Sequence, residues 1–290
     1  MGAGSFTPSS YAHYSSDLGR SYDHDTGRVV GQTFVARRMD DSLDPKKFTM
    51  RECANSEEHP NTIPVILGLD VTGSMGEACS ETAAALGVII TNLYKKFKDV
   101  EFCIMGIGDL AYDNAPIQMS QFESDVRIAE SLDKIFMEHG GGGNNFESYT
   151  VAWYMGLKRT KLDCFDKQAR KGIIITMGDK PLNPYLPVHK LNLAINGHEQ
   201  SDVETVALYK EACKKFDIFH IAVDSPEDCY DDNRVEIEGS FGRLLGDNYK
   251  VSTINGLAST IEKCITQSVQ GRQEAMPQQN LVNENGEISW

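Results

Sequence analysis

Hydrophobic positions follow two alternating patterns along most of this chain. Four short, continuous apolar runs are typical of strands that are covered on both faces. They are "IPVILGLD" (63–70), "VEFCIMGIGD" (100–109), "KGIIITMGD" (171–179) and "DIFHIAVD" (217–224). Between them apolar residues recur at helical spacing, as from Leu86 to Phe97 and from Leu257 to Ile265. This alternation predicts an α/β fold with three layers, a doubly wound and mostly parallel sheet with helices on both faces.

Weaker patterns predict the remaining elements. The segment "PIQMSQF" (116–122) is a candidate for a short edge strand, and apolar spacing over 128–136 predicts a helix. A further helix is expected after the glycine-rich stretch that ends at Ser148. Ser201 and Glu204 have the spacing of a capping box, which predicts a helix that starts there and runs to about Phe216.

The apolar patterning divides the chain into three parts. Residues 1–60 contain few apolar runs and are expected to form an extended arm that is partly ordered by docking. Residues 61–270 form the predicted α/β domain. Residues 271–290 are polar, have little to bury, and are expected to be a tail.

Composition excludes several classes of function. The 290 residues carry a formal net charge of −14, which argues against nucleic acid or an anionic membrane as the main ligand. The N-terminus lacks the basic start and apolar middle of a signal peptide, and no apolar run approaches membrane-spanning length. The 7 cysteines form no CxxC pair and fit a reducing compartment. We therefore expect a cytoplasmic protein.

Acidic residues close three of the predicted strands. Asp70, Asp109 and Asp179 each end an apolar run. In open parallel sheets, ligands bind outside the carboxyl ends of the strands, near the point where the strand order reverses. Three carboxylates at one edge repel one another, so we expect a positive group between at least two of them.

The stretch "VILGLDVTGSMGE" adds two hydroxyls to this edge. Asp70, Thr72 and Ser74 form the pattern D-x-T-x-S, in which alternate side chains of a turn can converge on one point. Carboxylate and hydroxyl oxygens are hard ligands that suit Mg²⁺, Mn²⁺ or Ca²⁺ rather than Zn²⁺. The pattern therefore predicts a site for a divalent cation.

These residues resemble a known family. The stretch is similar to the first strand and metal-ion-dependent adhesion site (MIDAS) of the von Willebrand factor A (VWA) family, whose usual motif is D-x-S-x-S. The family's third metal-binding loop is matched by Asp179 in "IIITMGDK". The stretch "GGGGNNFES" is similar to a glycine-rich second loop of some intracellular members, which places Asn144 at the ligand position and Glu147 just beyond it. The resemblance covers about Thr62 to Val269.

The resemblance implies a function and a ligand set. The metal ligands would be Asp70, Thr72, Ser74, Asn144 and Asp179, with Mg²⁺ as the expected ion and Mn²⁺ or Ca²⁺ as alternatives. The cation would keep one coordination position for a carboxylate of an Asp or Glu on a partner protein. The implied protein is not an enzyme but a cation-dependent protein-interaction module.

Three other interpretations stay open at this stage. The strand and Asp70 also resemble Mg²⁺-dependent phosphotransferases of the haloacid-dehalogenase type, but Thr72 stands where their second aspartate is expected. A structural or assembly protein could carry a vestigial site and bind through its arm. Asp70 could also be a simple N-cap of the following helix.

Overall fold

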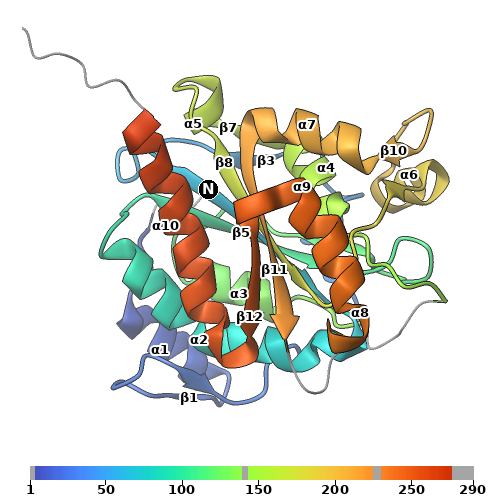
Figure 1. Cartoon of the computed structure of the whole chain (residues 1–290). Helices are drawn as coiled ribbons and strands as arrows, with labels where there is room; N and C mark the ends of the chain where they lie inside the picture. Colours follow the sequence, from blue (N-terminus) through green and yellow to red (C-terminus); the bar gives the residue numbers. More distant parts are fainter. Residues whose placement is uncertain (1–3, 139–142, 225–229, 276–290) are drawn as a thin grey trace, which may run out of the picture.

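Six strands form the central sheet of the computed structural model, which describes residues 4–138, 143–224 and 230–275 (Figure 1). In space the strands follow the order β12-β11-β8-β4-β5-β6. Their bounds are β4 (Ile63–Asp70), β5 (Val100–Ile107), β6 (Ile117–Met119), β8 (Gly172–Gly178), β11 (Phe216–Asp224) and β12 (Tyr249–Thr253). All neighbours are parallel except β5 and β6, which are antiparallel. This is the doubly wound, mostly parallel α/β sheet that the sequence predicts, with β6 as the predicted edge strand.

The chain reverses its direction of growth between β4 and β8. The strands β4, β5 and β6 follow one another to one edge, whereas β8, β11 and β12 extend from β4 to the other edge. The carboxyl ends of β4 and β8 therefore flank the switch point of the sheet, which is where such folds bind ligands.

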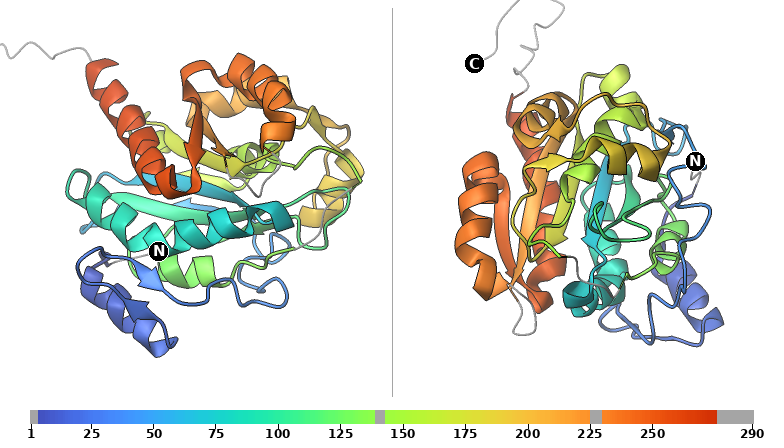
Figure 2. Two further views of the ribbon diagram at one scale, coloured as in Figure 1. Left: turned by 60° about the horizontal axis from the view of Figure 1, so that its bottom comes forward. Right: turned by 90° about the vertical axis from the view of Figure 1, so that its right-hand side faces the viewer.

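Helices cover both faces of this sheet, as Figure 2 shows. One face packs against α2 (Gly76–Tyr94), α3 (Arg127–Asp133) and α10 (Leu257–Ala275). The other face packs against α4 (Thr150–Lys158), α6 (Val188–Ile195), α7 (Thr205–Lys215) and the run α8 (Tyr230–Ile237), η2 (Glu238–Gly242) and α9 (Arg243–Leu245). Of these, η2 is a π-helical turn. None of the helices within the described ranges is long and apolar enough to cross a bilayer.

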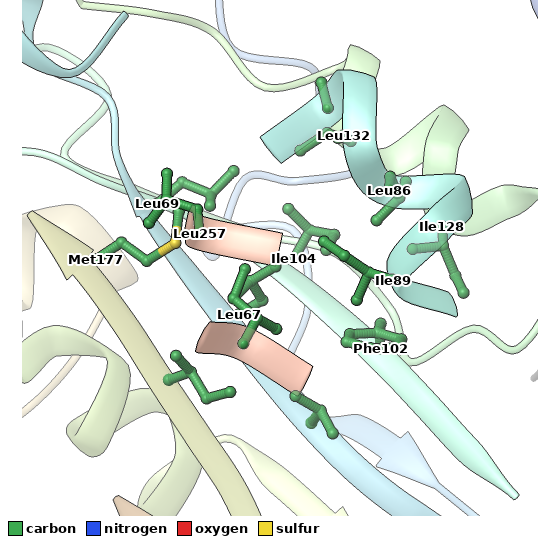
Figure 3. Packing of buried hydrophobic residues seen from close by; sticks show 14 of the residues in the cluster. Leu67, Leu69, Leu86, Ile89, Phe102, Ile104, Ile128, Leu132, Met177 and Leu257 are labelled. Carbon is green, nitrogen blue, oxygen red and sulfur yellow. The ribbon is translucent and has the colours of Figure 1, made fainter. Parts of the chain in front are cut away.

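Alternate residues of the central strands point to opposite faces, because side chains alternate along a strand. Leu67 and Leu69 of β4 lie in the cluster under α2 and α10, whereas Ile66 lies in the cluster on the other face. Figure 3 shows Leu67 and Leu69 near Ile104, Met177 and Leu257. The strands are apolar on both faces, which explains why they read as continuous apolar runs.

The arm before the sheet packs on α2 and α3. It contains α1 (Pro8–Asp17), β1 (Ser21–Tyr22), β2 (Val29–Val30) and β3 (Arg51–Cys53), which pairs with β7 (Thr160–Leu162). Tyr11 is buried and donates a hydrogen bond to the carbonyl of Ala83 at 3.1 Å. Arg20 donates two hydrogen bonds to the carboxylate of Asp133, at 2.7 and 2.6 Å. The left view of Figure 2 shows this blue segment against the helices below the sheet.

The predicted capping box at Ser201 is wrong. The helix begins at Thr205, after the short strand β10 (Val203–Glu204), which pairs with β9 (Tyr185–Leu186). Asp202 instead accepts a hydrogen bond from the amide of Val188 at 2.8 Å. Pairing with β9 therefore holds this segment extended where local spacing suggested a helix start.

The remaining elements are short. They are η1 (Gly73–Met75), α5 (Asp163–Asp166), η3 (Gly246–Asn248) and η4 (Ile254–Gly256). Helix α10 continues through Gly271 to Ala275, and the rest of the predicted tail, 276–290, lies outside the described residues.

Candidate metal centre

Asp70 and Asp179 lie at the switch point of the sheet. Asp70 is the last residue of β4 and Asp179 follows the last residue of β8, and both side chains are fully buried. Because β4 and β8 are parallel neighbours, the two carboxylates meet at the same edge. The Asp179 charge raises the pKa of Asp70, although burial is the larger cause.

The turn after β4 holds the Asp70 carboxylate at one oxygen. Its Oδ1 accepts hydrogen bonds from the amide of Thr72 at 3.0 Å and from the Thr72 hydroxyl at 2.5 Å. A hydroxyl that donates its proton to a carboxylate keeps its lone pairs for a cation. Ser74 lies two residues further on, half-buried in η1. Helix α2 begins at Gly76 with Met75 at its N-cap, so Asp70 does not cap that helix.

Tyr149 holds the other oxygen of Asp70. Its hydroxyl donates to Asp70 Oδ2 at 2.6 Å and accepts a hydrogen bond from the amide of Lys180 at 3.3 Å. A Cβ built on Gly178 would lie 2.0 Å from the Tyr149 oxygen, so the approach of this phenol requires glycine there. Tyr149 therefore connects the end of β4 with the loop that carries Asp179.

Glu147 is a third buried carboxylate near this edge. It is 5% exposed and forms an isolated parallel bridge with Leu182, which lies a few residues after Asp179. Its Oε2 is buried and accepts no hydrogen bond within the part of the chain that the structure describes. Burial and then the charge of Asp70 are the two largest causes that raise the pKa of Glu147, to about 10.

Asn144 makes its contacts with a neighbouring loop. Its amide nitrogen donates to Asp109 Oδ2 at 2.8 Å, and its amide oxygen accepts from the backbone of Phe146 at 2.9 Å. The side chain is exposed. Asp109, two residues after β5, is buried and also accepts from the amide of Ala111 at 2.8 Å. The contacts of Asn144 thus brace the loops around Asp109, whereas Asp70 and Asp179 come together at the switch point.

Without a bound cation, burial makes the ionised form of Asp70 unfavourable. Burial first, and Asp179 second, raise the pKa of Asp70 to about 7, although hydrogen bonds from Thr72 and Tyr149 oppose the shift. A buried carboxylate is stabilised by a nearby positive charge. A divalent cation at this edge would supply one.

The available donors fit a hard cation. Among residues 4–138, 143–224 and 230–275, no group of three or more His, Cys, Asp or Glu is arranged to hold a metal ion. A site here would therefore combine the carboxylates of Asp70 and Asp179 with the hydroxyls of Thr72 and Ser74. Such an oxygen set fits Mg²⁺, Mn²⁺ or Ca²⁺.

Some solved structures are similar to this chain at low sequence identity. No protein-family model and no curated protein matches the chain. One similar solved structure is the pilus adhesin SpaC from Lactobacillus rhamnosus GG in its open conformation, with 11% identity and a TM-score of 0.45. That match covers 73% of this chain and 31% of the SpaC chain, so this chain spans less than a third of that chain.

A second similar structure is the vWF domain of the type V pili tip protein Mfa5 from Porphyromonas gingivalis. It is 11% identical with a TM-score of 0.41, and the match covers 79% of this chain and 98% of that domain. The fold class of this chain rests on its own strand order and layers rather than on these similarities.

Proposed function

We propose that this chain is a VWA-type protein-interaction module with a MIDAS-like cation site. Asp70, Thr72, Ser74 and Asp179 would hold the ion, which we expect to be Mg²⁺, with Mn²⁺ or Ca²⁺ as alternatives. When bound, the cation would supply a Lewis-acidic coordination position for a carboxylate of an Asp or Glu on a partner protein. In this proposal the protein acts in the cytoplasm and is not an enzyme.

One observation carries the proposal. Asp70 and Asp179 are fully buried at the carboxyl ends of the two strands that flank the switch point. Folding is disfavoured by such an arrangement, because burial and the charge of Asp179 both oppose the ionisation of Asp70. The Thr72 hydroxyl, which donates to Asp70 at 2.5 Å and keeps its lone pairs, supports a cation next to these carboxylates.

The residues of the proposed site have different roles. Asp70 orients the Thr72 hydroxyl and adds negative charge, while both of its oxygens accept hydrogen bonds from the protein. In this proposal Thr72, Ser74 and Asp179 contact the ion. For the second loop, Glu147 is favoured over the exposed Asn144 as an additional ligand, because its Oε2 is buried and has no hydrogen-bond partner among the described residues.

The proposal predicts stabilisation by divalent cations. Saturating Mg²⁺ or Mn²⁺ should raise the melting temperature, since a ligand that binds only the folded state stabilises it by about 2.7 kcal/mol at a hundred times its Kd. Asp70→Ala and Ser74→Ala should remove the increase. Ser80→Ala is the matched control, because Ser80 is exposed on α2 and its hydroxyl donates to the carbonyl of Gly76, within its own helix.

Two results would contradict the proposed site or its role in binding a partner. If Ser74→Ala responds to the cation as the parent does, the assignment of the site is wrong. The partner step is tested by comparing protein capture by the parent and by Ser74→Ala, with and without a chelator. Capture that ignores both the chelator and the substitution would contradict a cation-bridged contact.

A further inference from the structure

The buried Tyr149 side chain packs among aromatic rings and also donates a hydrogen bond to Asp70. The side chain is fully buried, and its ring lies 5.1 Å from the ring of His220 and 5.9 Å from that of Phe241, centroid to centroid. His220 and Phe241 stack on each other at 3.6 Å. The phenol also lies close to the backbone of Gly178, and its hydroxyl donates to the Asp70 carboxylate.

The hydroxyl stands between the two loops that carry the buried aspartates. It donates to Asp70 Oδ2 and accepts from the amide of Lys180, which is the residue after Asp179. Asp70 Oδ1 is held by Thr72. Because both oxygens of Asp70 are engaged, the plane of its carboxylate is fixed, and this in turn fixes the direction of the Thr72 hydroxyl.

We propose that Tyr149 is a positioning residue of the cation site. Its hydroxyl orients the Asp70 carboxylate relative to the Asp179 loop, so that the Thr72 oxygen faces the ion. The inference rests on the proposed function, because it assigns a role within the same site. Tyr149 acts through Asp70 and does not itself bind the metal.

Helix α4, which Tyr149 directly precedes, provides a matched control for a purely structural role. Tyr154 is buried in α4, and its hydroxyl donates to the carboxylate of Glu199 at 2.7 Å. It therefore makes the same kind of hydrogen bond as Tyr149, but to a residue outside the switch point. Replacing either tyrosine with phenylalanine removes one oxygen and one hydrogen bond to a carboxylate.

The test measures Mn²⁺ affinity by calorimetry for the parent, Tyr149→Phe and Tyr154→Phe, with unfolding by urea measured in the absence of metal. Both variants should lose stability, but only Tyr149→Phe should bind Mn²⁺ more weakly. We expect a loss of about tenfold or more, the range for losing one hydrogen bond to a charged group. Equal Mn²⁺ affinity of Tyr149→Phe and the parent would overturn the inference and leave the proposed function standing. A parent that binds no Mn²⁺ would overturn both.

A second measurement covers the case in which Tyr149→Phe does not fold. Binding of Mg²⁺ next to Asp70 should change the ultraviolet absorbance of the buried phenol that is bonded to it. The parent and Tyr154→Phe should therefore show the same tyrosine difference spectrum on addition of Mg²⁺. A parent that binds Mg²⁺ without any tyrosine difference spectrum would contradict the role of Tyr149.

Discussion

Strand β4 contains both an apolar interior part and, at its carboxyl end, an acidic residue that is equally buried. Leu67 and Leu69 of β4 are at most 1% exposed, and Asp70, the next residue, is fully buried. Burial stabilises the leucines, because apolar surface leaves water, whereas it raises the free energy of the aspartate charge. The interior of the sheet thus follows the requirements of stability, while the carboxyl ends of β4 and β8 follow another requirement, which we propose is cation binding.

The largest effect is expected from a substitution in the interior. Phe102 of β5 is 1% exposed and lies in the cluster shown in Figure 3. Phe102→Ala should lower the free energy of unfolding by about 3–5 kcal/mol, because it removes apolar contacts and leaves a cavity. Urea unfolding measures the loss.

The Mn²⁺ affinity of folded Phe102→Ala shows whether the apolar interior and the proposed cation site are independent. It should stay at the value of the parent, since Phe102 takes no part in the edge. A Phe102→Ala protein that remains folded but loses Mn²⁺ binding would show that the two regions are not separable.

The second expected effect is a dependence of stability on pH that cations remove. In the metal-free protein the pKa of Asp70 is raised from 3.8 to about 7, and burial is the main cause. The stabilising contribution of the protonated form is complete below pH 3.8 and is lost as the pH rises through 7. At about 1.4 kcal/mol per pKa unit, the loss is on the order of a few kcal/mol. Glu147, whose pKa is raised to about 10, extends the decline to higher pH.

Urea unfolding between pH 5 and pH 8.5 measures this decline, in chelator and in saturating Mg²⁺. Mg²⁺ should flatten the curve, since it stabilises the ionised carboxylates. Asp70→Ala in chelator should reduce the decline to the part that Glu147 contributes. Stability in chelator that rises from pH 5 to pH 8.5, with no difference between the parent and Asp70→Ala, would contradict this account of the edge.

The smallest expected effect separates the two candidates of the second loop. Glu147→Gln removes a buried carboxyl group that would ionise on binding the cation, and it should weaken Mn²⁺ binding about tenfold, which corresponds to about 1.4 kcal/mol. Asn144→Ala should change the affinity less, because the Asn144 amide is bonded to Asp109 and Phe146. Calorimetric titration of both variants compares them. A larger loss in Asn144→Ala than in Glu147→Gln would favour Asn144 as the ligand.

The sequence predicts the central sheet well because its strands are buried on both faces. Continuous apolar runs closed by aspartates correctly locate β4, β5, β8 and β11. The edge strand β12 was not predicted, since its residues are mostly exposed or half-buried and carry no continuous apolar run. Helix α1 was also not predicted, although Thr7 at its N-cap and Pro8 at its first position are recognisable start signals.

The candidate site was predicted in part. The pattern D-x-T-x-S and the strand-closing Asp179 identify residues that the fold brings to one switch point. Tyr149 was not predicted, because an aromatic residue at the start of an apolar helix reads as packing. Gly178 is the signal that was available, since a glycine directly before Asp179 permits the close approach of the phenol.

The most direct test of the central claim is an anomalous difference map from crystals soaked in Mn²⁺. The account predicts a single strong peak at the switch point, within coordinating distance of the Thr72 and Ser74 hydroxyls and close to Asp179. A map with no peak there, or with the ammonium group of Lys180 in the space between Asp70 and Asp179, would contradict it.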